Sequence, residues 1–300
     1  MVSPDTSLTT LPRDEATVPR QHESSLAAFW YRFRQNKPAI LGAVIVAAMV
    51  VCAATAPFIA PYDPNYQDLN HIVQPPGHGH LLGTDDLGRD MLSRIIFGAR
   101  IAVGASIIPV LLAMVVGVPL GLVTGYFRGL WDDVVMRIVD ALQAFPFLIL
   151  ALALASILGP GFLNAMIAIG IGFIPAFIRI VRGQVLTVST RDYILAARSF
   201  GTGNIRIVLL HVLPNSLAPL LVQTSVAMAA AILAEAGLSF LGVGVQPPTA
   251  SWGQMLTVAQ EYINSAPWLA VWPGAAIFLA VLGFNLLGDG IRDALDPRMG

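Results

Sequence analysis

The 300-residue sequence predicts an all-α integral membrane protein with about six transmembrane helices. Hydrophobic residues make up 56% of the chain and charged residues only 12%, whereas a soluble domain carries roughly 25% charged residues. The mean hydropathy of +0.71 is too high for a water-soluble fold, because the surface exposed to water would then be apolar as well. Lipid is therefore the expected solvent for much of the surface.

Six apolar stretches have about the length that a bilayer requires, which is roughly 20 helical residues. They are residues 38–60, 101–126, 134–158, 163–181, 215–236 and 267–288. A transmembrane bundle tolerates prolines in such stretches, since neighbouring groups satisfy the carbonyls that a proline frees. The prolines accepted on this ground are Pro109, Pro119, Pro146 and Pro175. We therefore expect each stretch to form one span.

The N-terminal region divides into two parts. Residues 1–23 are polar and lack the short apolar core of a secretory signal, which predicts a disordered cytoplasmic tail. In residues 24–37, Leu26, Phe29 and Phe33 recur at helical spacing beside basic side chains. This pattern predicts a short helix in the membrane interface. The alternative is an extension of the first span.

The positions of the basic residues orient the chain. With the N-terminus in the cytoplasm, all but three of the 17 basic residues lie on the inside. The exceptions, Arg89, Arg94 and Arg100, share the predicted outside loop 61–100 with five aspartates, and residues 237–266 carry no basic residue. Cytoplasmic loops are enriched in Lys and Arg, so both termini are expected in the cytoplasm.

Residue types that enzymes need are scarce. Lys37 is the only lysine, so the chain has no P-loop lysine for ATP hydrolysis, and it has no HExxH or GxSxG motif. His71, His78 and His80 cluster in the first outside loop, where a zinc or nickel site is the alternative to a flexible loop rich in proline and glycine. We expect the flexible loop, and therefore no bound metal. Because the enzyme motifs are missing, we also expect no catalytic residue and no bound cofactor.

The segment between the fourth and fifth spans has the pattern of two short helices joined by a turn. It reads RDYILAARSFGTGNIRIVLLHVLPN over residues 191–215. Ser189 and Asp192 predict a capping box that starts a helix near residue 190. Gly201 can end that helix in the left-handed conformation, a second helix follows from Asn204, and Pro214 opens the fifth span. One face of the first helix carries Tyr193, Ala196, Ala197 and Phe200.

This segment resembles the EAA loop of ATP-binding-cassette importer permeases, here residues 189–214. The positions that match its pattern are Ala196, Ala197, Gly201, Leu213 and Pro214. Leu195 stands where the pattern has glutamate and His211 where it has isoleucine, as in the peptide-transporting branch of the family. Three further stretches, residues 81–100, 238–256 and 284–298, resemble signatures of the dipeptide and oligopeptide permeases of the C type.

The resemblance covers nearly all of the chain from residue 24 and implies the type I importer permease fold. It implies that the chain translocates di- or oligopeptides or similar small solutes, with glutathione and nickel complexes as alternatives. The residues implied to couple transport to ATP hydrolysis are Tyr193, Ala196, Ala197, Gly201, His211, Leu213 and Pro214.

The implied partners are a second permease of the B type, two ATPase subunits that use ATP and Mg, and an extracytoplasmic solute-binding protein. The complex is implied to lie in the cytoplasmic (inner) membrane of a prokaryote, in contact with membrane lipid, and no nucleic acid is expected as a partner. Two other readings remain: an ATP-independent secondary transporter or channel, and a membrane scaffold that transports nothing.

Ionisable residues inside spans are candidates for the transport pathway, because they are costly in lipid. Glu235, near the outer end of the fifth span, is the tentative pathway residue and would face a peptide's amino terminus or cap a helix contact. Asp140 is expected to pair with Arg137, one turn earlier. Residues 246–266 have a helix-like rhythm and are expected to form an interfacial or re-entrant helix that helps receive the binding protein. The alternative is that Trp252 and Tyr262 only anchor this segment at the membrane boundary.

Small residues recur every fourth position on the second span. They are Gly117, Gly121 and Gly125. Small residues at this spacing allow two helix backbones to approach closely, which predicts a helix-packing seam rather than a chemical site.

Overall fold

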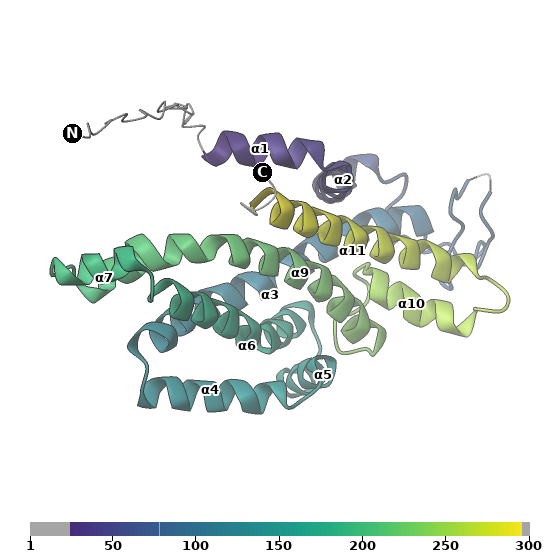
Figure 1. Ribbon diagram of the computed structural model, residues 1–300. Coiled ribbons are helices and arrows are strands. Elements are labelled where there is room, and N and C mark those ends of the chain that lie inside the picture. The colour runs from purple at the N-terminus through teal and green to yellow at the C-terminus, as the bar shows by residue number, and fades with distance from the viewer. Residues whose placement is uncertain (1–24, 78, 296–300) are drawn as a thin grey trace, which may run out of the picture.

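The protein is a bundle of long helices, seen here in a computed structural model that describes residues 25–77 and 79–295 (Figure 1). Helices dominate these ranges, and the only β pairing within them is an isolated bridge between Thr84 and Asp90. The predicted all-α fold class is confirmed. The expected tail over residues 1–23 lies outside the described residues.

The described helices follow one another in chain order, and the longest connection between them is residues 60–90, between α2 and α3. They are α1 Ser25–Gln35, α2 Lys37–Ile59, α3 Met91–Phe127, α4 Leu130–Gln143, α5 Phe147–Leu158, α6 Phe162–Val188, α7 Asp192–Ser199, α8 Asn204–Ile207, a π-helical segment Val208–Val212, α9 Leu213–Phe240, α10 Trp252–Glu261 and α11 Trp268–Leu295. Five stretches are long and apolar enough to cross a membrane, and a bent pair, α4 with α5, makes up to six.

The prediction that residues 134–158 form one continuous span is wrong. The chain ends α4 at Gln143, bends by 93° and begins α5 at Phe147, directly after Pro146. Proline lacks the N–H that a helix interior needs and disfavours helical geometry in the residue before it. Pro109 and Pro175 lie inside continuous helices, so the residue type alone does not decide where a span breaks.

The connection between α2 and α3 is shorter than the predicted loop 61–100, because α3 begins at Met91. The carboxylate of Asp90 caps this helix by accepting hydrogen bonds from the Ser93 N–H at 2.8 Å and the Ser93 hydroxyl at 2.7 Å. Arg94, whose charge suggested a loop, is buried and donates to the Pro64 carbonyl at 3.0 Å. The connection and α10 lie at one end of the bundle, and α7 lies at the other (Figure 1).

Helix α1 is separate from the first span, as expected. Asn36 divides α1 from α2, and its side-chain oxygen caps α2 by accepting from the Ala39 N–H at 3.1 Å. The Asn36 amide also donates to Asp293 on α11 at 2.9 Å. Phe33 packs in the small cluster that α1 shares with α2 and α11. The position of helix α1 in the membrane interface stays a prediction.

The predicted glycine seam is confirmed, and it joins α3 to α6. A Cβ atom placed on Gly121 would lie 2.7 Å from the Cβ of Val181 and 2.8 Å from the Ile178 carbonyl oxygen. Gly117 and Gly125 face α6 in the same way, against Phe177 and Val185. The two backbones therefore approach more closely than any larger residue on α3 would allow.

Candidate functional site

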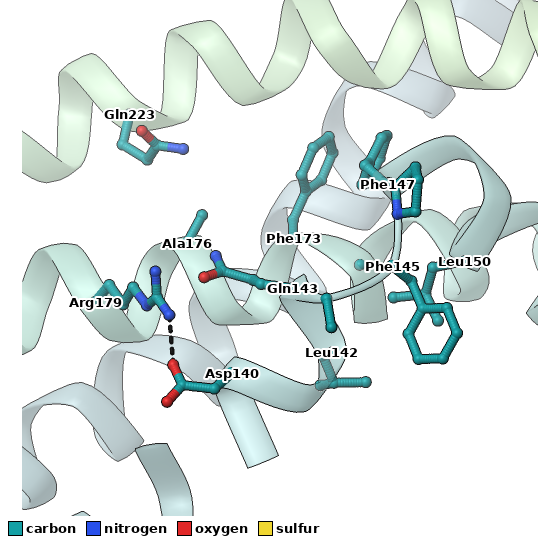
Figure 2. Close-up of a pocket in the computed structure, with 13 residues that line it drawn as sticks. Asp140, Leu142, Gln143, Phe145, Phe147, Leu150, Phe173, Ala176, Arg179 and Gln223 are labelled. Atoms are coloured by element: carbon teal, nitrogen blue, oxygen red, sulfur yellow. Dashed lines mark hydrogen bonds and ion pairs between the residues drawn. The ribbon is translucent and has the colours of Figure 1, made fainter. Parts of the chain in front are cut away.

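A cavity of about 760 Å³ opens at the break between α4 and α5, bounded by α6 and α9 (Figure 2). The volume is in the range of small-molecule sites, about 300–1,000 Å³. Because α4 stops at Gln143 and α5 leaves at a steep angle, the space beside α6 is not filled by a continuing helix. The break that the sequence did not reveal is thus what creates the cavity.

One part of the cavity wall is polar. Arg179 of α6 donates to Asp140 of α4 at 2.5 Å, and the two side chains remain 47% and 58% exposed. Gln143 and Gln223 also line the cavity (Figure 2). The predicted pairing of Asp140 with Arg137 is wrong, because the side chain of Asp140 reaches across to α6 instead of along its own helix.

Another part of the wall is aromatic. Phe147 and Phe173 stack with ring centroids 4.7 Å apart and planes 15° from parallel. Gly172 makes room for this arrangement, since a Cβ there would lie 2.8 Å from the Phe147 ring. The exposed ring of Phe145 adds a third aromatic side chain. The cavity therefore offers charged and amide groups beside a flat apolar surface.

The segment between α6 and α9 forms the expected pair of short helices. Gly201 ends α7 with a φ of +77°, so its predicted left-handed conformation is confirmed. Its N–H donates to the Arg198 carbonyl at 2.9 Å, and the Thr202 N–H donates to the Ala197 carbonyl at 3.0 Å. The second helix begins at Asn204 and continues through the π-helical segment into α9.

The predicted capping box is wrong. Helix α7 begins at Asp192, and its N-cap residue is Arg191, whose side chain makes no capping hydrogen bond. Ser189 instead ends α6, with helical φ and ψ and its N–H bonded to the Val185 carbonyl at 2.9 Å. The preceding helix thus extends through the position where the sequence pattern suggested a start.

The surface of this segment is apolar and exposed. Phe200 is 90% exposed, and Ile205, Tyr193 and Leu195 are also exposed, whereas Ile194 of α7 is fully buried. The ring of His211 lies 6.3 Å from the ring of Tyr193, which brings two of the predicted residues together. Ala196 and Ala197 lie on α7, and Leu213 and Pro214 form the first residues of α9.

Sequence reasoning missed Tyr126, at the end of α3. Its hydroxyl donates to the Asn204 side-chain oxygen at 2.9 Å, and the Arg198 guanidinium lies 5.2 Å above its ring. Tyr126 therefore links the longest helix of the bundle to both short helices. An aromatic residue at the end of a span was the available signal, but tyrosines at membrane boundaries are common anchors.

Comparison with known proteins decides the family. Residues 117–300 match the model described as "Binding-protein-dependent transport system inner membrane component", and residues 24–76 match the N-terminal TM domain of oligopeptide transport permease C. The chain belongs to this family of transport permeases. It is a multi-pass membrane protein, and its relatives are transport subunits.

Similar proteins cover almost the whole chain. The di/tripeptide transport system permease protein DppC of Pseudomonas aeruginosa is 45% identical, with 93% of this chain and 94% of the relative aligned. The dipeptide transport system permease protein DppC of Haemophilus influenzae is 41% identical over 98% and 99%. The glutathione transport system permease protein GsiD of Pectobacterium atrosepticum is 43% identical over 95% and 96%.

A solved structure confirms the fold. The MetNI methionine ABC transporter, in inward-facing conformations, matches with a TM-score of 0.57 and 21% identity, over 69% of this permease and 98% of the solved chain. The predicted fold of an ATP-binding-cassette importer permease is therefore correct.

Glu235, the tentative pathway residue, is enclosed by the permease's own groups. Its side chain is only 3% exposed and accepts a hydrogen bond from the Ser239 hydroxyl at 2.7 Å. That hydroxyl accepts in turn from the Val245 N–H at 2.9 Å. Glu235 does not line the α4–α6–α9 cavity. This geometry favours a role in fixing the turn after α9, and the pathway role stays a hypothesis.

The histidines of the α2–α3 connection pair with separate aspartates. His71 lies 2.7 Å from Asp68, whose pKa this hydrogen bond lowers, and His80 lies 2.9 Å from Asp90. His78 is outside the described residues. Among the residues that the structure does describe, no three His, Cys, Asp or Glu side chains are grouped to hold a metal ion.

Proposed function

We propose that this permease translocates short peptides into the cytoplasm as one subunit of an ATP-driven importer, with both of its termini in the cytoplasm. The observation that carries this proposal is the α4–α6–α9 cavity, whose polar and aromatic walls suit a solute with a charged backbone and variable side chains. Relatives named for dipeptide, di/tripeptide and glutathione transport support the same class of solute. Glutathione is itself a peptide, and nickel complexes remain the outlying alternative.

A second permease completes the pathway in this proposal. Charged and amide groups are costly when they face hydrocarbon, and the Asp140–Arg179 pair is half exposed on this chain alone. A partner subunit of similar design that covers α4, α5 and α9 removes that cost and closes the cavity into a path. The B-type permease is the partner that we propose.

One of the two ATPase subunits docks on the segment from α7 to α8, which we propose as the coupling segment. Its apolar residues Phe200 and Ile205 are exposed, and α7 lies at one end of the bundle (Figure 1). Tyr126 connects this segment to α3, so movement of α7 can reach the helices that support the cavity. ATP and Mg bind to the ATPases, which differ in affinity for the two permease states and so drive the change between them.

An extracytoplasmic binding protein delivers the solute at the opposite end, where the α2–α3 connection and α10 lie (Figure 1). This end is held together by buried polar contacts. Arg89 donates to Asp85 at 2.6 Å, and partial burial raises the pKa of neighbouring Asp86. Such a rigid surface suits repeated docking of a soluble partner.

The first experiment is a pull-down of the tagged permease from native membranes in mild detergent, with identification of the proteins that accompany it. A second permease and P-loop ATPases are expected. These subunits, reconstituted with the binding protein, should then accumulate a labelled dipeptide only when ATP is supplied. Uptake by the permease alone, without ATP, would instead establish the secondary transporter.

A further inference from the structure

Two ion pairs join α4 to α6, and they differ in the number of hydrogen bonds between their side chains. Asp132 receives two hydrogen bonds from Arg182, both at 2.7 Å, and its side chain is 11% exposed. Asp140 receives one from Arg179. Within the described residues, neither Asp140 nor Arg179 has another hydrogen-bond partner. Hydrogen-bonding capacity therefore remains unused on the pair that faces the cavity.

The side-chain amides of Gln143 and Gln223, beside this pair, also have unused hydrogen-bonding capacity. Gln143 and Gln223 project into the cavity from α4 and α9 (Figure 2), and neither side chain bonds another described residue. An amide can donate and accept at once, as a peptide bond requires. A ligand with donors and acceptors for all four side chains would therefore complete the hydrogen bonding that the permease itself leaves open here.

The charges suit a ligand that carries both signs. Arginine binds carboxylates through parallel hydrogen bonds, and an aspartate pairs with an ammonium group. An adjacent Asp and Arg have no net charge, so a ligand of one sign gains little from them. A short peptide presents an ammonium and a carboxylate about 7 Å apart when two residues are extended, farther apart than the groups of the closed pair.

We propose that the Asp140–Arg179 pair is a specificity element that opens to bind both termini of the passing peptide. Arg179 takes the terminal carboxylate, Asp140 takes the terminal ammonium, and the two glutamines take the peptide bond. The stacked rings of Phe147 and Phe173 accept side chains without selecting among them. This inference rests on the proposed function, because it assigns the ends of the peptide to residues of the same cavity.

The test uses the complete reconstituted importer and three labelled dipeptides: one with free termini, one N-acetylated and one C-amidated. The same binding protein serves every variant, so any change in discrimination between wild type and variant arises in the permease. Arg179→Gln should lower uptake of the free dipeptide about tenfold, the loss of one charge-assisted contact. It should also abolish discrimination against the C-amide while keeping discrimination against the N-acetyl form. Asp140→Asn should do the reverse.

Two further variants separate recognition from structure. Asp132→Asn disturbs the other pair between the same helices and should leave both discrimination ratios at the wild-type value. The charge swap Asp140→Arg with Arg179→Asp keeps an ion pair but exchanges its ends, and it should assemble yet not recover uptake. Recovery of uptake in the swap, or unchanged discrimination in both single variants, would overturn the inference. No ATP-driven peptide uptake by the wild-type complex would overturn the proposed function, and this inference with it.

Discussion

Helix α6 has two faces, of which one is packed tightly against α3 and the other is open to the cavity. One face, at Phe177, Val181 and Val185, packs against the glycines of α3 with no space for a larger side chain. The other, at Phe173, Ala176 and Arg179, lines the cavity. In lipid, helix association depends on close packing rather than on a hydrophobic gain, so the packed face holds α6 in place while the cavity face stays available to a ligand.

The comparison predicts the largest loss of stability on the packed face. Gly121→Leu should destabilise the permease by about 3 kcal/mol, since overpacking a filled interface forces backbone shifts. The measurement is the thermal midpoint in detergent together with the fraction recovered with its partners. Gly183→Leu is the matched control, because a Cβ at Gly183 of α6 meets no atom within 4 Å. Equal stability of the two variants would contradict the distinction between the faces.

A smaller effect on stability, but a large one on transport, is expected at the turn of the coupling segment. Gly201→Val should cost about 1–2 kcal/mol locally, because a β-branched residue resists positive φ. Membrane insertion should persist, while ATP hydrolysis becomes uncoupled from uptake. The readout is peptide transported per ATP hydrolysed.

Gly203 provides the control for that turn, since its φ is −64° and its Cβ position is open. Gly203→Val should therefore transport normally. Normal substrate-stimulated uptake in Gly201→Val would count against the coupling assignment and leave α7 as a simple connection.

The exposed ring of Phe200 should matter only for association. Phe200→Ala removes an apolar anchor that is 90% exposed in this chain, so the fold should keep its thermal midpoint. Recovery of the ATPases in a pull-down should fall about tenfold, as for an interface hot spot. Undiminished recovery would place the ATPase contact elsewhere on the segment.

The smallest effect is expected at Glu235, where a buried polar group is already satisfied. Glu235→Gln retains an oxygen that can accept from Ser239, so uptake should stay within about twofold of wild type. Unchanged uptake would remove the hypothesis that its charge serves the pathway. A loss as deep as that of Asp140→Asn would restore it.

The sequence alone determined the features that depend on local pattern. Composition and apolar length predicted an all-α membrane protein, four-residue glycine spacing predicted the packed seam, and Gly201 predicted a left-handed helix end. Each of these follows from a property of a single helix or turn, so it can be read from neighbouring residues.

Only the tertiary structure decided how those helices meet. Of the four prolines singled out in the predicted spans, three lie inside continuous helices, whereas Pro146 lies at a break between two helices. Asp140 bonds to Arg179 on another helix rather than to Arg137 on its own, and packing leaves Glu235 only 3% exposed. The pairing of Asp140 and the burial of Glu235 depend on elements distant in sequence, because a side chain contacts what the packed bundle places beside it, and periodicity along one helix does not contain that information.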